Sequence, residues 1–448
     1  MRQSAGGPLT GRWWGAAVVA LALSGVVAGA HADALVDRAQ ALQQQGQHAE
    51  AFALLDAQEA DRAGDPAFDK ALAQVAEGVG LYTRALLAWE RALQAQPGDE
   101  QAQDAVARML QVLGDWRALQ ALPPQVRQRS AAVGAALEMD QFLYSYDRLG
   151  SGGKSSLHGA FDIGVGRDSN VNAGLDPNGN YPSLPGVPAW TVDPAAWEHS
   201  SAYLSGALTL RGRYVLSPQW SVVGGLYSEA RHYGGDASRD EPFMADAQLG
   251  MAWRANRHEW MVTARGIHEA RDGSKVRGAG GLQGEWIYRV DGLNQFGAFL
   301  QSLQLHYPGQ SVRDVRRTVA GVNHAVVLRS GSLFYLGAYG GEESPRQASA
   351  ADLGHHLLGV RLGGQWAVHP RWSLFGSLDT ERRHFGADDP FFLLRRKETQ
   401  WRAVLGVSWV PAPQWRVSPQ VEWVDVRSSV PIHPYRRSVF SLVVRREF

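Results

Sequence analysis

The sequence contains no cysteine, which excludes a disulfide framework, thiolate metal sites, a catalytic thiol and a lipid-anchored cysteine. Its 44 basic residues are balanced by 44 acidic ones, so the chain lacks the basic excess that attracts nucleic acid. Lysine is scarce, since 40 of those basic residues are arginine. Beyond residue 32 no segment approaches the ~20 consecutive apolar residues of a membrane-spanning helix. Any further membrane contact therefore has to use strands.

Motifs of enzymes and cofactor sites are also missing. The chain has no Gly-x-Ser-x-Gly nucleophile turn and no His-Glu-x-x-His metal pair. His355 and His356 are adjacent on an expected strand, so their side chains point to opposite faces and cannot chelate together. We therefore expect no enzymatic activity, no cofactor and no metal.

The first 32 residues have the organisation of a signal peptide. Arg2 and Arg12 precede an apolar stretch over residues 13–30, and Ala30-His31-Ala32 offers small residues at the cleavage positions. We expect cleavage after Ala32, which sends the mature chain beyond the inner membrane. The alternative is a membrane-anchoring helix, since about 18 residues nearly span a bilayer.

A period of 34 residues marks the region 33–125 and predicts stacked pairs of helices. The middle copy resembles a tetratricopeptide repeat, whereas Pro123 and Pro124 cut the third copy short. Such an array offers a groove for an extended polypeptide, or it serves as a spacer that orients the next domain. Residues 126–155 are expected to form a helical segment and a linker, with the helix capping the array or packing inside the next domain. The repeat-defining residues are Gly46, Ala51, Gly80, Tyr82, Ala85, Trp89, Ala92, Pro97, Gly114 and Trp116.

Glycine and tryptophan increase after position 150, where 36 of the 50 glycines and 12 of the 16 tryptophans lie. From residue 156 to residue 448, apolar and polar residues alternate with the period of two that is typical of strands. In residues 202–216, for example, Leu204 and Leu210 lie on one face and Arg211 lies on the other. One face suits lipid and the other water, although a soluble sandwich also alternates.

The connections favour a barrel over a sandwich. Six short turns alternate with seven longer loops between residues 156 and 448, which makes fourteen strands. Tryptophan and tyrosine residues open or close strands beside the short turns, as expected for rings at the lipid headgroup level. The predicted fold is an N-terminal tetratricopeptide-like α-solenoid followed by a 14-stranded antiparallel transmembrane β-barrel. An even strand count places both barrel ends on the periplasmic side of the outer membrane, together with the helical domain.

Charged residues of both signs occupy the water-facing register of the clearest strands. Mixed charge suits a passage for varied polypeptide better than one for a polyanion. The alternative is that these residues pair across the lumen and stiffen the wall. The predicted lumen-facing residues are Arg211, Arg213, Asp246, Arg254, Arg416 and Glu422.

The C-terminal strand carries an apolar stripe that resembles the signal for outer-membrane insertion. Outer-membrane lipid and the barrel-assembly machinery are therefore expected partners. Arg446 interrupts the stripe. The stripe consists of Phe440, Leu442, Val444 and Phe448.

The order of signal, short repeat array and C-terminal barrel resembles the surface lipoprotein assembly modifier family. Two segments carry the resemblance, residues 164–172 (GVGRDSNVN) and the terminal PYRR motif that leads into residues 438–448. For Asp168 and Asn170 themselves, the sequence favours a local role as side-chain caps where a strand passes into a loop. The resemblance implies that the protein helps a client lipoprotein or secreted protein to cross or be displayed on the outer membrane.

Two alternatives belong to other functional classes. An exopolysaccharide exporter calls for a longer repeat array and for lumen-facing aromatic residues, whereas most aromatics here fall on the lipid-facing register or its rim. A diffusion porin with a periplasmic spacer is the second alternative.

Overall fold

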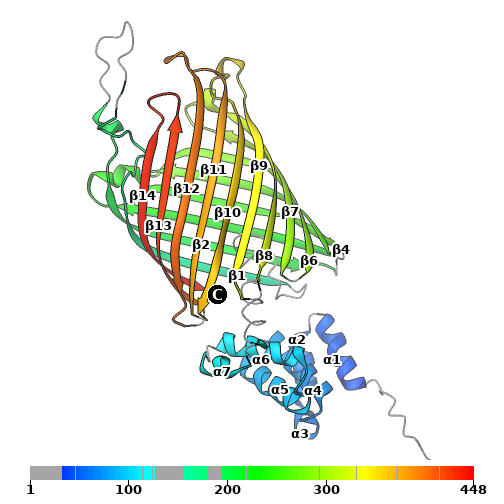
Figure 1. The fold of residues 1–448 in the computed structure, drawn as a ribbon. Helices are drawn as coiled ribbons and strands as arrows, with labels where there is room; N and C mark the ends of the chain where they lie inside the picture. The colour runs from blue at the N-terminus through cyan, green and yellow to red at the C-terminus, as the bar shows by residue number, and fades with distance from the viewer. Residues whose placement is uncertain are drawn as a thin grey trace, which may run out of the picture.

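A computed structural model of the 448-residue chain shows a group of α-helices followed by an antiparallel β-barrel (Figure 1). It describes residues 33–45, 47–113, 116–123, 125–126, 155–179, 181, 193–217, 219–255, 257–291, 293–328, 330–369, 371–412 and 414–448. The predicted signal peptide, residues 1–32, lies outside the described residues, and so does almost all of the predicted segment 126–155. Among the described residues, no helix has the length and apolarity needed to cross a membrane.

The helical region is built from short helices around one apolar core. Neighbouring helices pack in the order α1–α2, α4–α5, α5–α6 and α6–α7, and both α1 and α2 also contact α4. The last of these helices ends before the two prolines at positions 123 and 124. The helices are α1 (Ala34–Gln44), α2 (His48–Asp56), α3 (Glu59–Arg62), α4 (Pro66–Gly78), α5 (Tyr82–Ala95), α6 (Glu100–Leu113) and α7 (Trp116–Ala121).

The α4–α5 pair shows how the sequence positions these helices. Asp65 caps α4, since its carboxylate accepts the backbone N–H groups of Ala67 and Phe68. Gly80 connects the two helices with φ of +79°, a conformation that costs glycine little. The indole of Trp89 is 1% exposed, and its N–H donates to Glu77 at 2.5 Å. The aromatic ring therefore fills the helix interface without leaving its donor unsatisfied.

The repeat-defining residues have different surroundings. Ala51, Ala85 and Ala92 are fully buried, whereas Tyr82 is exposed at the start of α5. Pro97 follows the end of α5, and Trp116 begins α7. Gly46 and Gly114 lie outside the described residues.

The rest of the described chain forms fourteen antiparallel strands that close into one barrel. This confirms the predicted barrel of fourteen antiparallel strands. The strands are β1 (Ser156–Asp168), β2 (Ser201–Val215), β3 (Trp220–Tyr233), β4 (Pro242–Ala255), β5 (His258–Arg271), β6 (Ser274–Asp291), β7 (Asn294–His306), β8 (Val315–Val327), β9 (Leu333–Pro345), β10 (His355–His369), β11 (Trp372–Asp388), β12 (Arg395–Trp409), β13 (Trp415–Ser428) and β14 (Tyr435–Glu447).

Each strand pairs with its neighbours in the sequence, and β1 pairs with β14 to close the wall. Connections at one end, the short-turn end, are brief, as between β2 and β3. The connections at the other end, the long-loop end, are mostly longer. An exception is the β5–β6 turn, where Asp272 and Gly273 have φ of +49° and +69°. Two successive positive φ values are typical of a hairpin turn whose twist matches the flanking strands.

Candidate functional site: the inner face of the barrel

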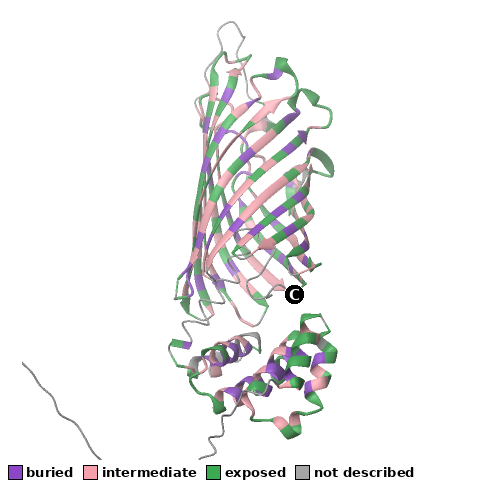
Figure 2. Ribbon diagram, turned by 90° about the vertical axis from the view of Figure 1, so that its right-hand side faces the viewer, coloured by how far each residue is buried: buried purple, intermediate pink, exposed green. Residues whose placement is uncertain are grey.

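The barrel wall has two chemically different faces, because side chains alternate along each strand. Figure 2 shows buried, intermediate and exposed residues following one another along the strands. Apolar residues on the outer face stand exposed, as Leu204, Leu249 and Leu405 show with 53%, 64% and 64% of their surface accessible. The alternate residues carry most of the charges and line the enclosed space, which we call the lumen. Such an inside-polar, outside-apolar wall is the pattern of a barrel surrounded by lipid.

Tryptophan side chains gather on the outer face near the short-turn end. Trp220, Trp253, Trp260 and Trp286 are directly opposite one another on successive strands β3 to β6. On the far side of the barrel, Trp372 stacks on Trp409 with ring centroids 5.7 Å apart. Rows of indole rings at one level are typical of an interface between lipid headgroups and water.

A buried carboxylate organises the inner face near the short-turn end. Glu259 is fully buried and pairs with three arginines, Arg213, Arg254 at 3.0 Å and Arg289 at 2.8 Å. Arg213 also donates to the hydroxyl of Ser221 at 3.2 Å. These contacts join β2, β3, β4, β5 and β6, so the Glu259 cluster ties together five adjacent strands.

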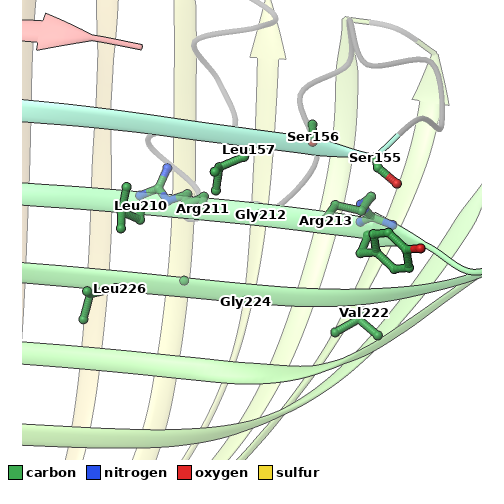
Figure 3. Close-up of a pocket in the computed structure, with 12 residues that line it drawn as sticks. Ser155, Ser156, Leu157, Leu210, Arg211, Gly212, Arg213, Val222, Gly224 and Leu226 are labelled. Atoms are coloured by element: carbon green, nitrogen blue, oxygen red, sulfur yellow. The ribbon is translucent and has the colours of Figure 1, made fainter. Parts of the chain in front are cut away.

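The other predicted lumen-facing residues lie elsewhere on the inner register. Asp246 binds Arg265 on the next strand, with the Nε–Oδ1 distance at 3.0 Å. Arg416 lies 3.8 Å from Glu447, and Arg211 occupies the position next to the Glu259 cluster on β2 (Figure 3). Sequence reasoning missed Glu259 and Arg265 as partners, although both stand on the same alternating register of β5.

A ladder of four charged side chains crosses β10 to β13. Arg361 Nε lies 2.5 Å from Asp379 Oδ1, and Asp379 stands directly opposite Arg402 in the register. Arg402 binds the predicted residue Glu422 through two parallel bonds of 3.0 and 3.1 Å. The side chains of Arg361 and Arg402 are 50% and 49% exposed. Unlike the Glu259 cluster, this charged ladder therefore reaches the water of the lumen.

Two ion pairs cross the seam between β1 and β14 on the inner face. Asp162 binds Arg445 through bonds of 2.7 and 2.8 Å. Nearer the long-loop end, the fully buried Asp168 accepts from Arg437 Nε at 3.0 Å and from the Tyr233 hydroxyl at 3.0 Å. Asp168 is thus both part of the wall and the anchor of the loop that follows it.

The loop after β1 is held by the polar residues of the DSNVN segment. The backbone N–H of Asn170 donates to Asp168 Oδ1 at 3.0 Å, and the Asn170 side chain donates to the carbonyls of Gly174 and Arg436 at 2.9 Å. Asn172 donates to the carbonyl of Trp197 at 2.8 Å. These side chains therefore cap the strand-to-loop transition, as the sequence suggested, and also contact β14.

The C-terminal residue completes the seam at the short-turn end. The backbone groups of Phe448 exchange hydrogen bonds of 2.8 and 2.9 Å with Gly159 on β1. Its ring lies over Gly159, where an added Cβ would stand 2.3 Å from the ring carbons. Arg446 does not break the apolar face sharply, since its guanidinium packs 5.3 Å from the ring centroid of Trp415. The predicted stripe residues Phe440, Leu442 and Phe448 are all exposed on the outer face, and Val444 is partly exposed there.

Aromatic side chains also occupy the inner register, although most aromatics lie on the outer face. Several of them lie against a glycine directly opposite on the next strand, so the ring covers backbone where a side chain would otherwise stand. Clear examples are Tyr335 over Gly363 and Tyr339 over Gly359. The inner aromatics are Tyr203, Tyr227, Tyr233, Phe299, Tyr335, Tyr339, Phe375, Phe385 and Tyr435.

A hollow of about 570 Å³ lies on the wall over β1, β2 and β3 (Figure 3). Gly212 and Gly224 face each other directly there, and the absence of two side chains creates the space. Leu157, Leu210 and Leu226 border it. The hollow thus has mainly apolar sides and belongs to the outer face.

No group of three or more histidine or acidic side chains within the described ranges is arranged to hold a metal ion. His355 and His356 do stand on opposite faces of β10. His355 packs on Phe385 with ring centroids 4.7 Å apart, and His356 is largely exposed.

No protein-family model and no curated protein sequence matches the chain. Several solved structures have a distant similarity to the chain. A Pseudomonas aeruginosa FadL homologue is 8% identical, with 65% of this chain and 90% of that chain covered and a TM-score of 0.37. OmpT of Vibrio cholerae is 9% identical over 66% and 97%, and the channel DcaP of Acinetobacter baumannii is 10% identical over 66% and 98%, both with a TM-score of 0.37.

Proposed function

We propose that the protein is an outer-membrane channel that carries or displays a client protein, with its helical region in the periplasm. The observation that carries this proposal is the wall itself, which is apolar outside and lined by compensated charges inside. A closed strand ladder is the arrangement that lets such a wall cross lipid without unpaired backbone groups. The rows of tryptophan near the short-turn end support a membrane boundary at that level.

The inner charges suit a chain of mixed composition. The positive and negative side chains alternate along the charged ladder, so no single sign of charge dominates there. A translocating polypeptide carries both signs, whereas a polyanion is favoured by a uniformly basic lining. The client is a lipoprotein or a secreted protein, and the helical region engages it before it enters the barrel. The resemblance to the surface lipoprotein assembly modifier family supports this assignment of the client.

Thiol labelling tests the orientation, because the natural chain has no cysteine to interfere. Gln310 lies exposed in a connection at the long-loop end, Gln219 in a turn at the short-turn end and Gln58 in the helical region. We expect a membrane-impermeant maleimide to label Gln310→Cys on intact cells and to label Gln219→Cys and Gln58→Cys only after the outer membrane is opened. Labelling of Gln58→Cys on intact cells would contradict the proposed orientation, because it would place the helical region outside the cell.

The activity is tested by comparing the surfaces of wild-type and deletion cells. Protease shaving followed by mass spectrometry identifies surface proteins, and a stain reports matrix polysaccharide. The proposal expects one or a few proteins to leave the surface or the medium while persisting inside the cell. If the surface proteins are unchanged but matrix polysaccharide is lost, the result would contradict client display and indicate polysaccharide export instead. Unchanged proteins and polymer, with high conductance in planar bilayers, would indicate a diffusion porin.

The choice of lumen variants follows from the structure. Reversing Arg211 and Arg213 together is a poor test, since Arg213→Glu places a second carboxylate beside the buried Glu259. The exposed pair Arg402 and Glu422 is a cleaner target. Arg402→Glu should reduce client display, and the exchange Arg402→Glu with Glu422→Arg serves as the matched control that restores the pair.

A further inference from the structure

We propose that the inner wall over β9 to β13 carries a binding strip for a linear, uncharged oligosaccharide. The strip consists of the rings of Tyr335 and Tyr339 and the charged ladder Arg361, Asp379, Arg402 and Glu422. This goes beyond the proposed function, because it assigns a ligand class to the wall that a protein client does not require.

The two tyrosine rings lie against the wall. An added Cβ on Gly359 would stand 2.2 Å from Tyr339 Cζ, and one on Gly363 would stand 2.6 Å from the Tyr335 hydroxyl oxygen. Each ring therefore covers the backbone of β10, and both tyrosines remain partly exposed on the inner face. Rings held in this way offer apolar surfaces at little conformational cost, since they are already fixed by the wall.

The spacing of the rings selects for an extended ligand. Tyr335 and Tyr339 are four residues apart on one strand, which corresponds to about 13 Å. A ligand that touches both rings must therefore be longer than a single sugar ring. Arg361 stands on β10 between the two glycines that the rings cover, and its guanidinium carbon lies 6.0 Å from the Tyr339 ring centroid.

The charged ladder lies at the level between the two rings. Its guanidinium groups donate hydrogen bonds and its carboxylates accept them, and both kinds are partly exposed to the lumen. A sugar hydroxyl both donates and accepts, so it can bond to either member of a pair. The apolar C–H faces of the same sugar can meanwhile pack on the tyrosine rings.

Other ligand classes fit this strip less well. The alternation of charge leaves a polyanion without a region of one sign to attract it. A wholly apolar ligand would have to remove water from two ion pairs without replacing its hydrogen bonds. A chain of neutral sugar rings meets both the apolar and the polar parts of the strip.

The opposite wall provides a matched control. Tyr227 on β3 also faces the lumen, but it stands opposite Thr209 and Asp246 rather than glycine. Its hydroxyl donates to Glu229 at 2.6 Å, as the Tyr339 hydroxyl donates to Glu381 at 2.8 Å. Tyr227→Ala therefore removes a lumen-facing tyrosine without touching the strip.

The experiment is isothermal titration calorimetry on the purified full-length protein in detergent, with maltoheptaose, cellohexaose and an isomaltooligosaccharide as separate probes. We expect the wild type to bind at least one of them. The double variant Tyr335→Ala/Tyr339→Ala should bind that probe at least about tenfold more weakly, and Tyr227→Ala should bind as the wild type does. Tyr335→Phe/Tyr339→Phe keeps both rings and should retain most of the affinity.

Heat-dependent gel mobility, which separates folded from unfolded barrels, shows whether each variant is folded. If Tyr335→Ala/Tyr339→Ala does not fold, it is replaced by Arg402→Gln, which removes one guanidinium group of the ladder and should cause the same loss of affinity. The inference is overturned if no probe binds the wild type, or if the folded strip variants bind as tightly as it does. The assay contains no client protein, so this outcome does not contradict the proposed function. Conversely, unchanged surface proteins in deletion cells would contradict the proposed function but not the sugar-binding strip.

Discussion

The Glu259 cluster allows a quantitative prediction about the stability of the barrel. In Glu259→Gln, three guanidinium groups lose the one carboxylate that they share, and the side chain of Arg213 is only 3% exposed. Removing one partner of a buried ion pair costs about 3–5 kcal/mol, because the remaining charge stays away from water. We therefore expect the free energy of unfolding to fall by about that amount.

The exposed pair Arg402 and Glu422 sets the comparison. Its arginine is 49% exposed, so water replaces much of what the carboxylate provides. Glu422→Gln should cost no more than about 1 kcal/mol, although the two substitutions make the same chemical change on the same inner wall. The difference between them therefore isolates burial as the cause.

The measurement is urea unfolding of the full-length protein refolded into phospholipid vesicles, followed by tryptophan fluorescence. The double variant Glu259→Gln/Arg213→Gln also removes the most buried cation of the cluster. It should lose less stability than the sum of its single variants, because the two residues interact directly. Equal losses for Glu259→Gln and Glu422→Gln, within about 0.5 kcal/mol, would refute the reasoning.

Two further predictions concern the helical region and the seam. Hydrogen bonds from Arg62 hold the pKa values of Asp33 and Asp65 below the ordinary 3.8, so their contribution to stability is present above that pH and is lost as the pH falls through the lower folded values. Arg62→Gln should therefore destabilise the helices at neutral pH, by circular dichroism of the full chain in urea, with the gap to wild type closing in acid. At the seam, Gly159→Ala should lower the folded fraction on heat-dependent gels, since its Cβ would meet the C-terminal phenylalanine ring at 2.3 Å. Gly206→Ala, whose Cβ meets nothing within 4 Å, should fold normally.

The architecture of the barrel was predictable from the sequence because two independent signals agree. The period of two fixes which residues share a face, and the alternation of short turns with longer loops fixes the number of strands. The signs of the inner charges followed from the same register, as Asp246 and Glu422 show. What makes these predictions possible is that, apart from β1 and β14 at the closure, strand neighbours in this barrel are also neighbours in sequence.

The partners in the lumen were less predictable, because side-chain reach matters there. Arg213 stands directly opposite Ser156 and Val223, yet its ion pair is with Glu259, three strands away on β5. Such a contact depends on the curvature of the closed wall, which the sequence pattern does not contain. The pairing of Tyr339 with Gly359 was not predictable by counting residues either, because β9 and β10 are joined by a longer connection over residues 346–354 that does not fix their register.

The seam between β1 and β14 bears on the route that the proposed client would take. A barrel with a polar lumen can pass a polymer along its axis or release it sideways through a parted seam. Here the seam is bonded by its strand ladder and by two interior ion pairs, Asp162–Arg445 and Asp168–Arg437, at different levels of the wall. Parting it would expose these charges and the ladder to lipid, which favours the axial route.

A disulfide across the seam tests this choice in a chain that has no other thiol. Ile163 and Val444 stand directly opposite each other on the outer face, as a hydrogen-bonded pair whose Cα atoms are expected about 5.5 Å apart, within the range of a disulfide. With Ile163→Cys/Val444→Cys oxidised, client display should continue at the wild-type level. Display that stops on oxidation and returns with reductant would place the route through the seam.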